Sequence, residues 1–232
     1  AADPTVRAAV SAGGVCSCVS ALDVHGVWVP PTDRSPHVRG RRHAQPAPGR
    51  KFCRRHRGPL PERCALDDVA TALAHAVCCL DAESIVVVLD SVRHLGLLSV
   101  DEIESALRSA PARIRRLLDL CDTAESGTET YVRLRLRSLH LPVRTQVEIP
   151  GVGQVDLVVG RRLIIEVDSE EFHGTAADRA KDYERDLQAR RLGYLPIRLT
   201  YRQVMFGWAA ALESILAITD RGEHLKEPIA RG

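Results

Sequence analysis

Aromatic residues are scarce in this sequence, at 4% of its 232 positions, so its core must be built from Leu, Val, Ile and Ala. No apolar run is long enough to span a membrane, and no signal-peptide pattern occurs at the N-terminus. The seven cysteines are an odd number and lack the spacing of a disulfide framework. From these absences we expect a reduced, cytoplasmic protein with no membrane partner.

Acidic residues are absent between Asp33 and Glu62, although the whole chain has a formal net charge of only +2. The basic residues of this interval are Arg34, Arg39, Arg41, Arg42, Arg50, Lys51, Arg54, Arg55 and Arg57. Many Pro and Gly residues and little apolar periodicity predict irregular strands or a partly mobile loop here. One interpretation is an arm that contacts the phosphates of a nucleic acid, and the other is a solvated basic loop.

Two cysteine-containing segments contain enough ligands for a zinc site. Cys16-Ser17-Cys18 and Cys53-Arg54-Arg55-His56 together supply three thiols and one imidazole. Structural zinc usually takes paired C-x2-4-C spacing, which these segments do not have. Isolated thiols that pack as small apolar groups are therefore the interpretation that we favour.

Three regions are expected: a mostly helical one over residues 1–120, which includes the basic loop, a second over 121–222, and a tail over 223–232. In the first region, helices are predicted at residues 4–12, 20–26, 66–80 and 82–95, with a strand at 27–29. Ser99 and Glu102 form a capping-box pattern for a further helix, and Pro111 opens another.

The second region is organised around two apolar strands that carry three acidic residues, Asp156, Glu166 and Asp168. Carboxylates on Val, Leu and Ile strands need a charged partner or a metal, because burying an unpaired charge is unfavourable. Glu166 and Asp168 are two residues apart, so on a strand they point to the same face. We interpret the three carboxylates as a divalent-metal site.

The length of the turn between these strands tests that interpretation. A two-residue turn would place Asp156 and Glu166 on opposite faces of the sheet. The three-residue loop Gly160-Arg161-Arg162 instead places them directly across from each other. A metal site at these residues requires the three-residue loop.

The remaining elements complete a mixed sheet flanked by helices, an α/β (α+β) class. Strands are predicted at residues 143–149, 155–159, 163–168 and 195–199, and helices at 130–139, 176–192 and 203–218. Ser126 and Glu129 match a capping box at the start of the first of these helices. Glu129 is also an alternative acidic ligand at the edge of the metal site, and the two roles are compatible.

Five patterns, taken in order, resemble one family of nucleases. They are Val-Asp-Leu-Val-Val at 155–159, Ile-Ile-Glu-Val-Asp-Ser at 164–169, Glu-Phe-His-Gly at 171–174, Asp182 with Arg185-Asp186, and Leu-Gly-Tyr-x-Pro-Ile-Arg-Leu-Thr at 192–200. Over residues 120 to 220 the chain resembles the Vsr-like (very-short-patch-repair-like) endonuclease domain of the PD-(D/E)XK, or restriction-endonuclease-like, superfamily. Cys18-Val19-Ser20-Ala21-Leu22-x-x-His25-Gly26 resembles the AbiEi-type antitoxin proteins of actinobacteria. Those often carry a winged helix ahead of this region, which has no counterpart in this sequence.

The resemblance implies roles for single residues. Asp156 matches the first metal-binding acid of the family and Glu166 the second. Asp168 stands at a position where the superfamily usually has Lys. An Asp at this position is the pattern of the Vsr-like relatives. His173 and Lys181 are then the residues expected to orient the attacking water.

The function implied is a Mg²⁺- or Mn²⁺-dependent DNA endonuclease or nickase in repair or defence, with the metal held by Asp156, Glu166 and the Val167 carbonyl. The catalytic set is Asp156, Glu166, Asp168, His173, Glu129 and Lys181. The residues expected to contact nucleic acid are Arg41, Arg42, Arg54, Arg55, Arg133, Arg161 and Arg185. Candidate protein partners are a second copy of the chain and a toxin protein.

Two other functions stay open. One is a catalytically weak or inactive DNA-binding, antitoxin-like regulator that keeps the nuclease fold, because fold alone does not establish activity. The other is a protein-interaction module whose acidic cluster is paired with Arg161, Arg162 or Lys181.

Overall fold

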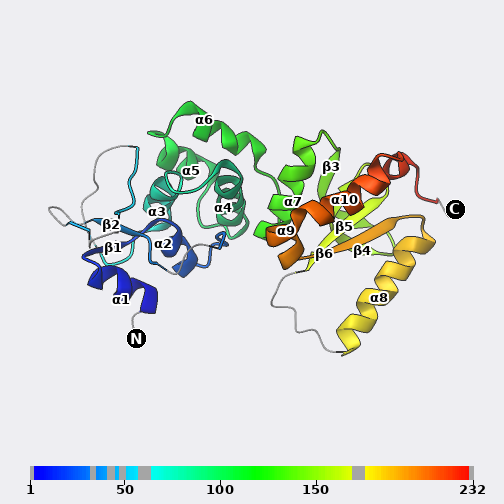
Figure 1. Ribbon diagram of the computed structural model, residues 1–232, viewed down its shortest axis with the longest axis horizontal. Coiled ribbons are helices and arrows are strands. Elements are labelled where there is room, and N and C mark those ends of the chain that lie inside the picture. Colours follow the sequence, from blue (N-terminus) through cyan, green and yellow to red (C-terminus); the bar gives the residue numbers. More distant parts are fainter. Residues whose placement is uncertain are drawn as a thin grey trace. The chain divides into compact units, whose positions relative to one another are not determined.

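The structure of the protein, a computed structural model, describes residues 3–31, 35–40, 45–46, 51–56, 64–168 and 176–229, and for 176–180 the backbone alone. The chain divides into two compact units, Ala1–Cys121 and Asp122–Gly232 (Figure 1). Helices and β-strands occur in both units, so the fold is of the mixed α/β class. Within the described ranges, no helix combines the length and the apolar composition needed to cross a membrane.

The first unit is mostly helical. Its helices are α1 (Pro4–Ser11), α2 (Cys18–Val24), α3 (Val69–Ala76), α4 (Ala82–His94), α5 (Val100–Leu107), α6 (Ala112–Arg115) and the 3₁₀ helix η1 (Arg116–Leu120). Their apolar faces meet in one core that includes Leu22, Leu73, Leu89 and Ile103. The predicted capping box is present, because the Ser99 hydroxyl accepts the Glu102 N–H and the Glu102 carboxylate accepts the Ser99 N–H.

A two-stranded sheet lies against these helices. Irregular strands were one expectation for the basic interval, but the pairing with residues 14–16 was not predicted. Strands β1 (Gly14–Cys16) and β2 (Val38–Gly40) pair antiparallel, with Val15 opposite Arg39. A Cβ at Gly14 would lie 2.3 Å from the Arg39 carbonyl oxygen, so only glycine allows this close approach. The predicted strand at residues 27–29 is wrong, since these residues are in neither helix nor strand.

Arg39 belongs to the acid-free basic interval, yet it serves the core of the first unit. Its side chain is only 6% exposed and forms two bonds to Asp67, Nε–Oδ2 at 2.6 Å and Nη2–Oδ1 at 2.8 Å. The Asp67 backbone N–H donates to the Cys16 carbonyl, so the ion pair lies beside β1. Arg39 is therefore a structural cation and is unavailable to a phosphate.

Removing one partner of this pair should destabilise the protein. Asp67→Asn removes the charge of one partner of this buried pair, a change that typically costs about 3–5 kcal/mol. Urea unfolding should show that loss relative to the wild type. Asp23→Asn, at an exposed position of α2, is the matched control and should change the free energy of unfolding by less than about 0.5 kcal/mol. Equal effects of the two substitutions would contradict a structural role for the pair.

The second unit contains a four-stranded mixed sheet. Strands β3 (Val143–Ile149), β4 (Gly153–Val159) and β5 (Leu163–Asp168) form an antiparallel meander, and β6 (Leu195–Thr200) pairs parallel to β5 (Figure 1). The crossover from β5 to β6 contains α8 (Ala176–Arg191). The predicted mixed sheet is confirmed, as is the predicted helix between its third and fourth strands.

The other helices of this unit are α7 (Gly127–Ser138), α9 (Tyr201–Phe206) and α10 (Trp208–Thr219). The single helix predicted at 203–218 is wrong, because the chain breaks at Gly207 into α9 and α10. Arg135 of α7 joins both: its guanidinium donates to the Val204 carbonyl at 2.7 Å and lies 5.1 Å from the centre of the Trp208 ring. An Arg stacked on an indole is a favourable cation–π contact.

The segment after α10 packs onto the turn between β4 and β5. It contains the 3₁₀ helix η2 (Glu223–Leu225), whose His224 carbonyl accepts the Arg161 N–H at 2.8 Å. Gly160 has a φ of +65°, and a Cβ there would lie 2.5 Å from the same carbonyl. The part of the predicted tail up to residue 229 therefore belongs to the second unit and fixes this turn.

Candidate active site

The register between β4 and β5 places the two central carboxylates across from each other. The ladder pairs Val159 with Leu163, which leaves Gly160-Arg161-Arg162 as the loop, and it pairs Leu157 with Ile165. The next positions in the same register are Asp156 and Glu166. The predicted three-residue loop is confirmed, and with it the placement that a metal site requires.

Beyond Leu157 and Ile165 no further ladder pairs form, although β4 extends back to Gly153 and β5 forward to Asp168. We call this point the fork. At the fork, side chains replace the missing backbone partners: Asp156 Oδ2 accepts the Val167 N–H at 2.8 Å, and Glu166 Oε2 accepts the Asp156 N–H at 3.4 Å. These bonds hold both carboxylates between the strands.

Glu129 joins the fork from the first turn of α7. Ser126 caps this helix by accepting the Glu129 N–H at 3.2 Å, but the reciprocal bond of a capping box is not made. The Glu129 carboxylate instead accepts the Glu125 N–H at 3.0 Å and the Gln146 side-chain amide at 2.8 Å. Gln146 falls opposite Asp156 in the β3–β4 register, between the pairs Thr145–Leu157 and Val147–Val155. Of the two roles considered for Glu129, the structure thus favours a place in the acidic cluster.

Burial raises the pKa of all three carboxyl groups, and repulsion by Asp156 adds to it for the two glutamates. Burial, and then the negative charge of Asp156, raise the pKa of Glu129 to about 7. The same two causes raise the pKa of Glu166 to about 7. Burial also raises the pKa of Asp156, against the opposing effect of the Val167 N–H. Near neutral pH the cluster therefore favours a proton or a cation.

Two arginines that the sequence did not single out as counter-charges approach the cluster. Arg185 of α8 donates to the Gln154 carbonyl at 2.6 Å and to Glu166 Oε1 at 3.3 Å. Arg198 lies beside Glu166 in the parallel register of β5 and β6, and its charge lowers the pKa of Glu166. Arg198 is the only charged residue of β6, an otherwise apolar strand, and this pattern could have identified it.

Arg198 binds three further acidic residues of the nuclease-like patterns. Its guanidinium contacts Asp186 at 3.1 and 3.2 Å, Asp168 at 3.4 Å and Asp182 at 3.9 Å. The Asp168 side chain is 45% exposed and turns to Arg198, whereas Asp156 and Glu166 bind each other's strand. Asp168 is therefore set apart from the central pair by its partner.

Two of the three counter-charges proposed for a protein-interaction module, Arg161 and Arg162, pair with other residues. Arg161 forms an ion pair with Glu227 and Arg162 one with Glu223, both in the C-terminal segment. Lys181 is exposed on α8, and its role at the site stays a prediction. The cations that approach the cluster are Arg185 and Arg198.

The predicted nucleic-acid contacts have different outcomes. Arg133 is 0% exposed inside α7, so its assignment as a contact residue is wrong. Arg54 is exposed and Arg55 is partly buried, and both lie in the first unit. Their contact with nucleic acid stays a prediction. Two further predicted contacts, Arg41 and Arg42, lie outside the described residues. So does His173, which was predicted to orient the attacking water.

The donor atoms at the fork suit a hard cation. Carboxylate oxygens favour Mg²⁺ or Mn²⁺, and Mg²⁺ commonly takes only one or two carboxylates from a protein and keeps several waters. Asp156 and Glu166 fit that requirement. Glu129 lies too far from them for the three carboxylates to place ligand atoms within 4.8 Å of one another. In the described part of the chain, a group that meets this distance is found only among cysteines and a histidine of the first unit.

Comparison of the chain with protein-family models, with curated proteins and with solved structures gives no match. The resemblance to the Vsr-like and AbiEi-type families accordingly stays a prediction.

The raised carboxyl pKa values predict how stability depends on pH without metal. A carboxyl group with a folded-state pKa of about 7 and an ordinary value of 4.5 stabilises the fold below pH 4.5, and this contribution is lost as pH rises through 7. Glu129→Gln stays uncharged throughout. Relative to the wild type it should gain up to about 3 kcal/mol of unfolding free energy between pH 4.5 and 8, in chelator.

Trp208 fluorescence during urea unfolding reports this gain for the second unit if Trp28, in the first unit, is replaced by Phe. Glu213→Gln, at an exposed position of α10, is the control and should show no such trend. A difference between Glu129→Gln and wild type that stays constant from pH 4.5 to 8 would contradict the shifted pKa.

Proposed function

We propose that the second unit is a Mg²⁺- or Mn²⁺-dependent phosphodiester hydrolase that cuts or nicks DNA. The observation that carries the proposal is the placement of Asp156 opposite Glu166 at the fork, with Glu129 beside them. Three like charges in a partly buried site are unfavourable for a structural role alone, whereas they suit a site that binds a divalent cation. The resemblance to the Vsr-like domain supports the same activity.

Each of these side chains has a task in such a reaction. Asp156 and Glu166 would hold the metal, which when bound supplies positive charge at the phosphate and lowers the pKa of a water. Glu129, with a pKa of about 7, can accept a proton at neutral pH, as a general base must. Arg185, whose side chain is 37% exposed next to Glu166, can contact a phosphate oxygen of the bound strand.

A second candidate function, a non-catalytic DNA-binding regulator, is favoured by one observation. Position 168, where the superfamily usually has Lys, holds an Asp whose partner is Arg198. An ion pair at that position neither activates a water nor contributes a free positive charge. In the nuclease proposal, activation of the water therefore falls to Glu129 or to the two residues expected to orient the water, His173 and Lys181.

A cleavage assay on supercoiled plasmid DNA tests the proposal. The full chain should nick or linearise the plasmid with Mg²⁺ or Mn²⁺ and not in chelator. Asp156→Asn and Glu166→Gln should each lower the rate by more than about 100-fold, because they remove transition-state stabilisation of several kcal/mol. Glu129→Gln should lower it by about 100-fold or more while DNA binding is retained.

Glu213→Gln is the matched control, because it makes the same chemical change on an exposed face of the same unit. It should cut at the wild-type rate. A wild type that binds DNA but cuts with neither ion would favour the regulator. A wild type that binds neither DNA nor metal at the fork would leave protein interaction as the role of the unit.

A further inference from the structure

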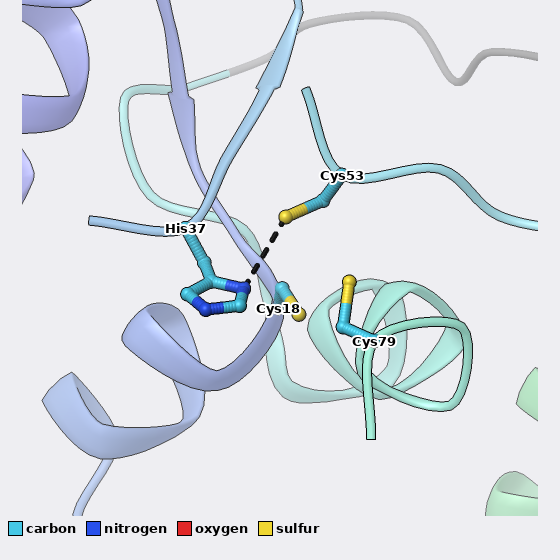
Figure 2. A group of neighbouring side chains, drawn as sticks. All are labelled: Cys18, His37, Cys53 and Cys79. Carbon is cyan, nitrogen blue, oxygen red and sulfur yellow. Dashed lines mark hydrogen bonds between the residues drawn. The ribbon is translucent and has the colours of Figure 1, made fainter. Parts of the chain in front are cut away.

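Three cysteines and a histidine of the first unit converge on one point. Cys18, His37, Cys53 and Cys79 each offer one ligand atom, and these atoms all lie within 4.8 Å of one another. Figure 2 shows the four side chains reaching toward a common centre from four separate segments. The interpretation of Cys18 and Cys53 as isolated thiols is therefore wrong, and Cys16 and His56 are not part of the group.

One sulfur–nitrogen distance within the group matches that around a tetrahedral metal. With Zn–S of about 2.3 Å and Zn–N of about 2.0 Å, sulfur and nitrogen ligands lie about 3.5 Å apart and two sulfurs about 3.8 Å apart. Cys53 Sγ lies 3.4 Å from His37 Nδ1. All seven cysteines of the chain are free thiols, so no disulfide competes for these sulfurs.

Backbone hydrogen bonds bring the ligands together independently of any ion. The Ser17 N–H donates to the His37 carbonyl at 3.1 Å, which sets His37 beside Cys18. The Cys53 N–H donates to the Val38 carbonyl at 2.8 Å, which sets Cys53 beside His37. Cys79 follows the end of α3, which packs against α2, where Cys18 is the first residue.

Cys18 also has an unusual backbone conformation. Its φ is +56°, in the left-handed region that a residue with a side chain rarely adopts. Such a conformation costs of order 1–3 kcal/mol and persists only where the surroundings require it. Here it lies at the step from β1 into α2 that carries the thiol, whose side chain is completely buried.

We propose that Cys18, His37, Cys53 and Cys79 form a structural zinc site. Three thiolates and one imidazole make a Cys₃His set that prefers Zn²⁺ to Mg²⁺ or Ca²⁺, because sulfur and nitrogen ligands are softer than oxygen. Four protein ligands complete a tetrahedron and leave no position for a substrate. The site is therefore structural and separate in chemistry from the carboxylates of the second unit.

The sequence explains what the zinc would hold in place. Between residues 41 and 63 the apolar residues apart from Pro are Ala44, Ala47, Phe52, Cys53 and Leu60, and of these Phe52 and Cys53 pack against the core of the first unit. Zinc would join the residues on both sides of this interval, through His37 and Cys79, to Cys53 within it. The exposed Arg54 would then be positioned next to a ligand.

Metal content tests the site directly. The full chain, purified reduced and without added metal, should contain one zinc per chain by mass spectrometry. Replacement with Co²⁺ should give tetrahedral d–d bands together with sulfur-to-cobalt charge transfer. Removal of zinc should speed hydrogen exchange at residues 37–40 and 51–56 and leave residues 143–168 unchanged.

Substitutions identify the ligands. Cys53→Ser and Cys79→Ser should each weaken cobalt binding by more than about 100-fold, since they remove a ligand itself. Cys78→Ser changes the neighbouring, exposed cysteine and should bind as the wild type does. His37→Cys keeps four ligands, so it should retain one metal with stronger charge transfer even where the serine variants fail to fold.

Three results would overturn the proposal. The first is a reduced wild-type chain that binds neither zinc nor cobalt at one equivalent. The second is an equal loss of binding in Cys78→Ser and Cys79→Ser. The third is a disulfide between any two of Cys18, Cys53 and Cys79 in protein prepared without oxygen.

Discussion

The second unit depends on one constraint, the burial of like charges where two apolar strands separate. Glu129, Asp156 and Glu166 are each largely withdrawn from water, and the charge of Asp156 raises the pKa values of the two glutamates further. The surrounding structure compensates with donors: the Val167 N–H and the Gln146 amide each bind a carboxylate directly. Arg185 adds a partial counter-charge at 3.3 Å. A cluster compensated only in part stays responsive to protons and to metal ions.

Much of the second unit could be predicted because its elements are long and regular. Alternation over seven residues located β3, and the number of residues in the loop predicted that Asp156 lies opposite Glu166. Gly207 interrupts a helix whose apolar pattern continues on both sides, so periodicity alone could not locate the break. Arg133 looks like a surface residue by type, and only the packing of α7 shows that it is fully buried.

The first unit was harder to predict, because its determinants are short or distant. Strands of three residues carry no alternation that could distinguish β1 and β2 from loops. The group formed by Cys18, His37, Cys53 and Cys79 draws its members from four segments, and no two ligands have the close spacing that marks a zinc motif. Cysteine counting fails when the tertiary fold, rather than local sequence, supplies the spacing. The two proposed sites differ in their donor atoms, with sulfur and nitrogen in the first unit and oxygen in the second. The two sites would therefore bind different metals.

The contact between Gly160 and His224 limits which changes the β4–β5 turn can accept. One inserted residue would reverse the parity of β5 and move Glu166 to the other side of the sheet. Two inserted residues would restore parity, but the longer loop would displace η2, whose backbone carbonyl already leaves no room for a Cβ at Gly160. The length of this turn is therefore fixed by the alternation of side chains along β5 and by the steric contact with η2. Substitutions at Arg161 other than Pro keep the loop length and the backbone N–H that binds the His224 carbonyl, whereas variants that change the loop length would lose the geometry of the site.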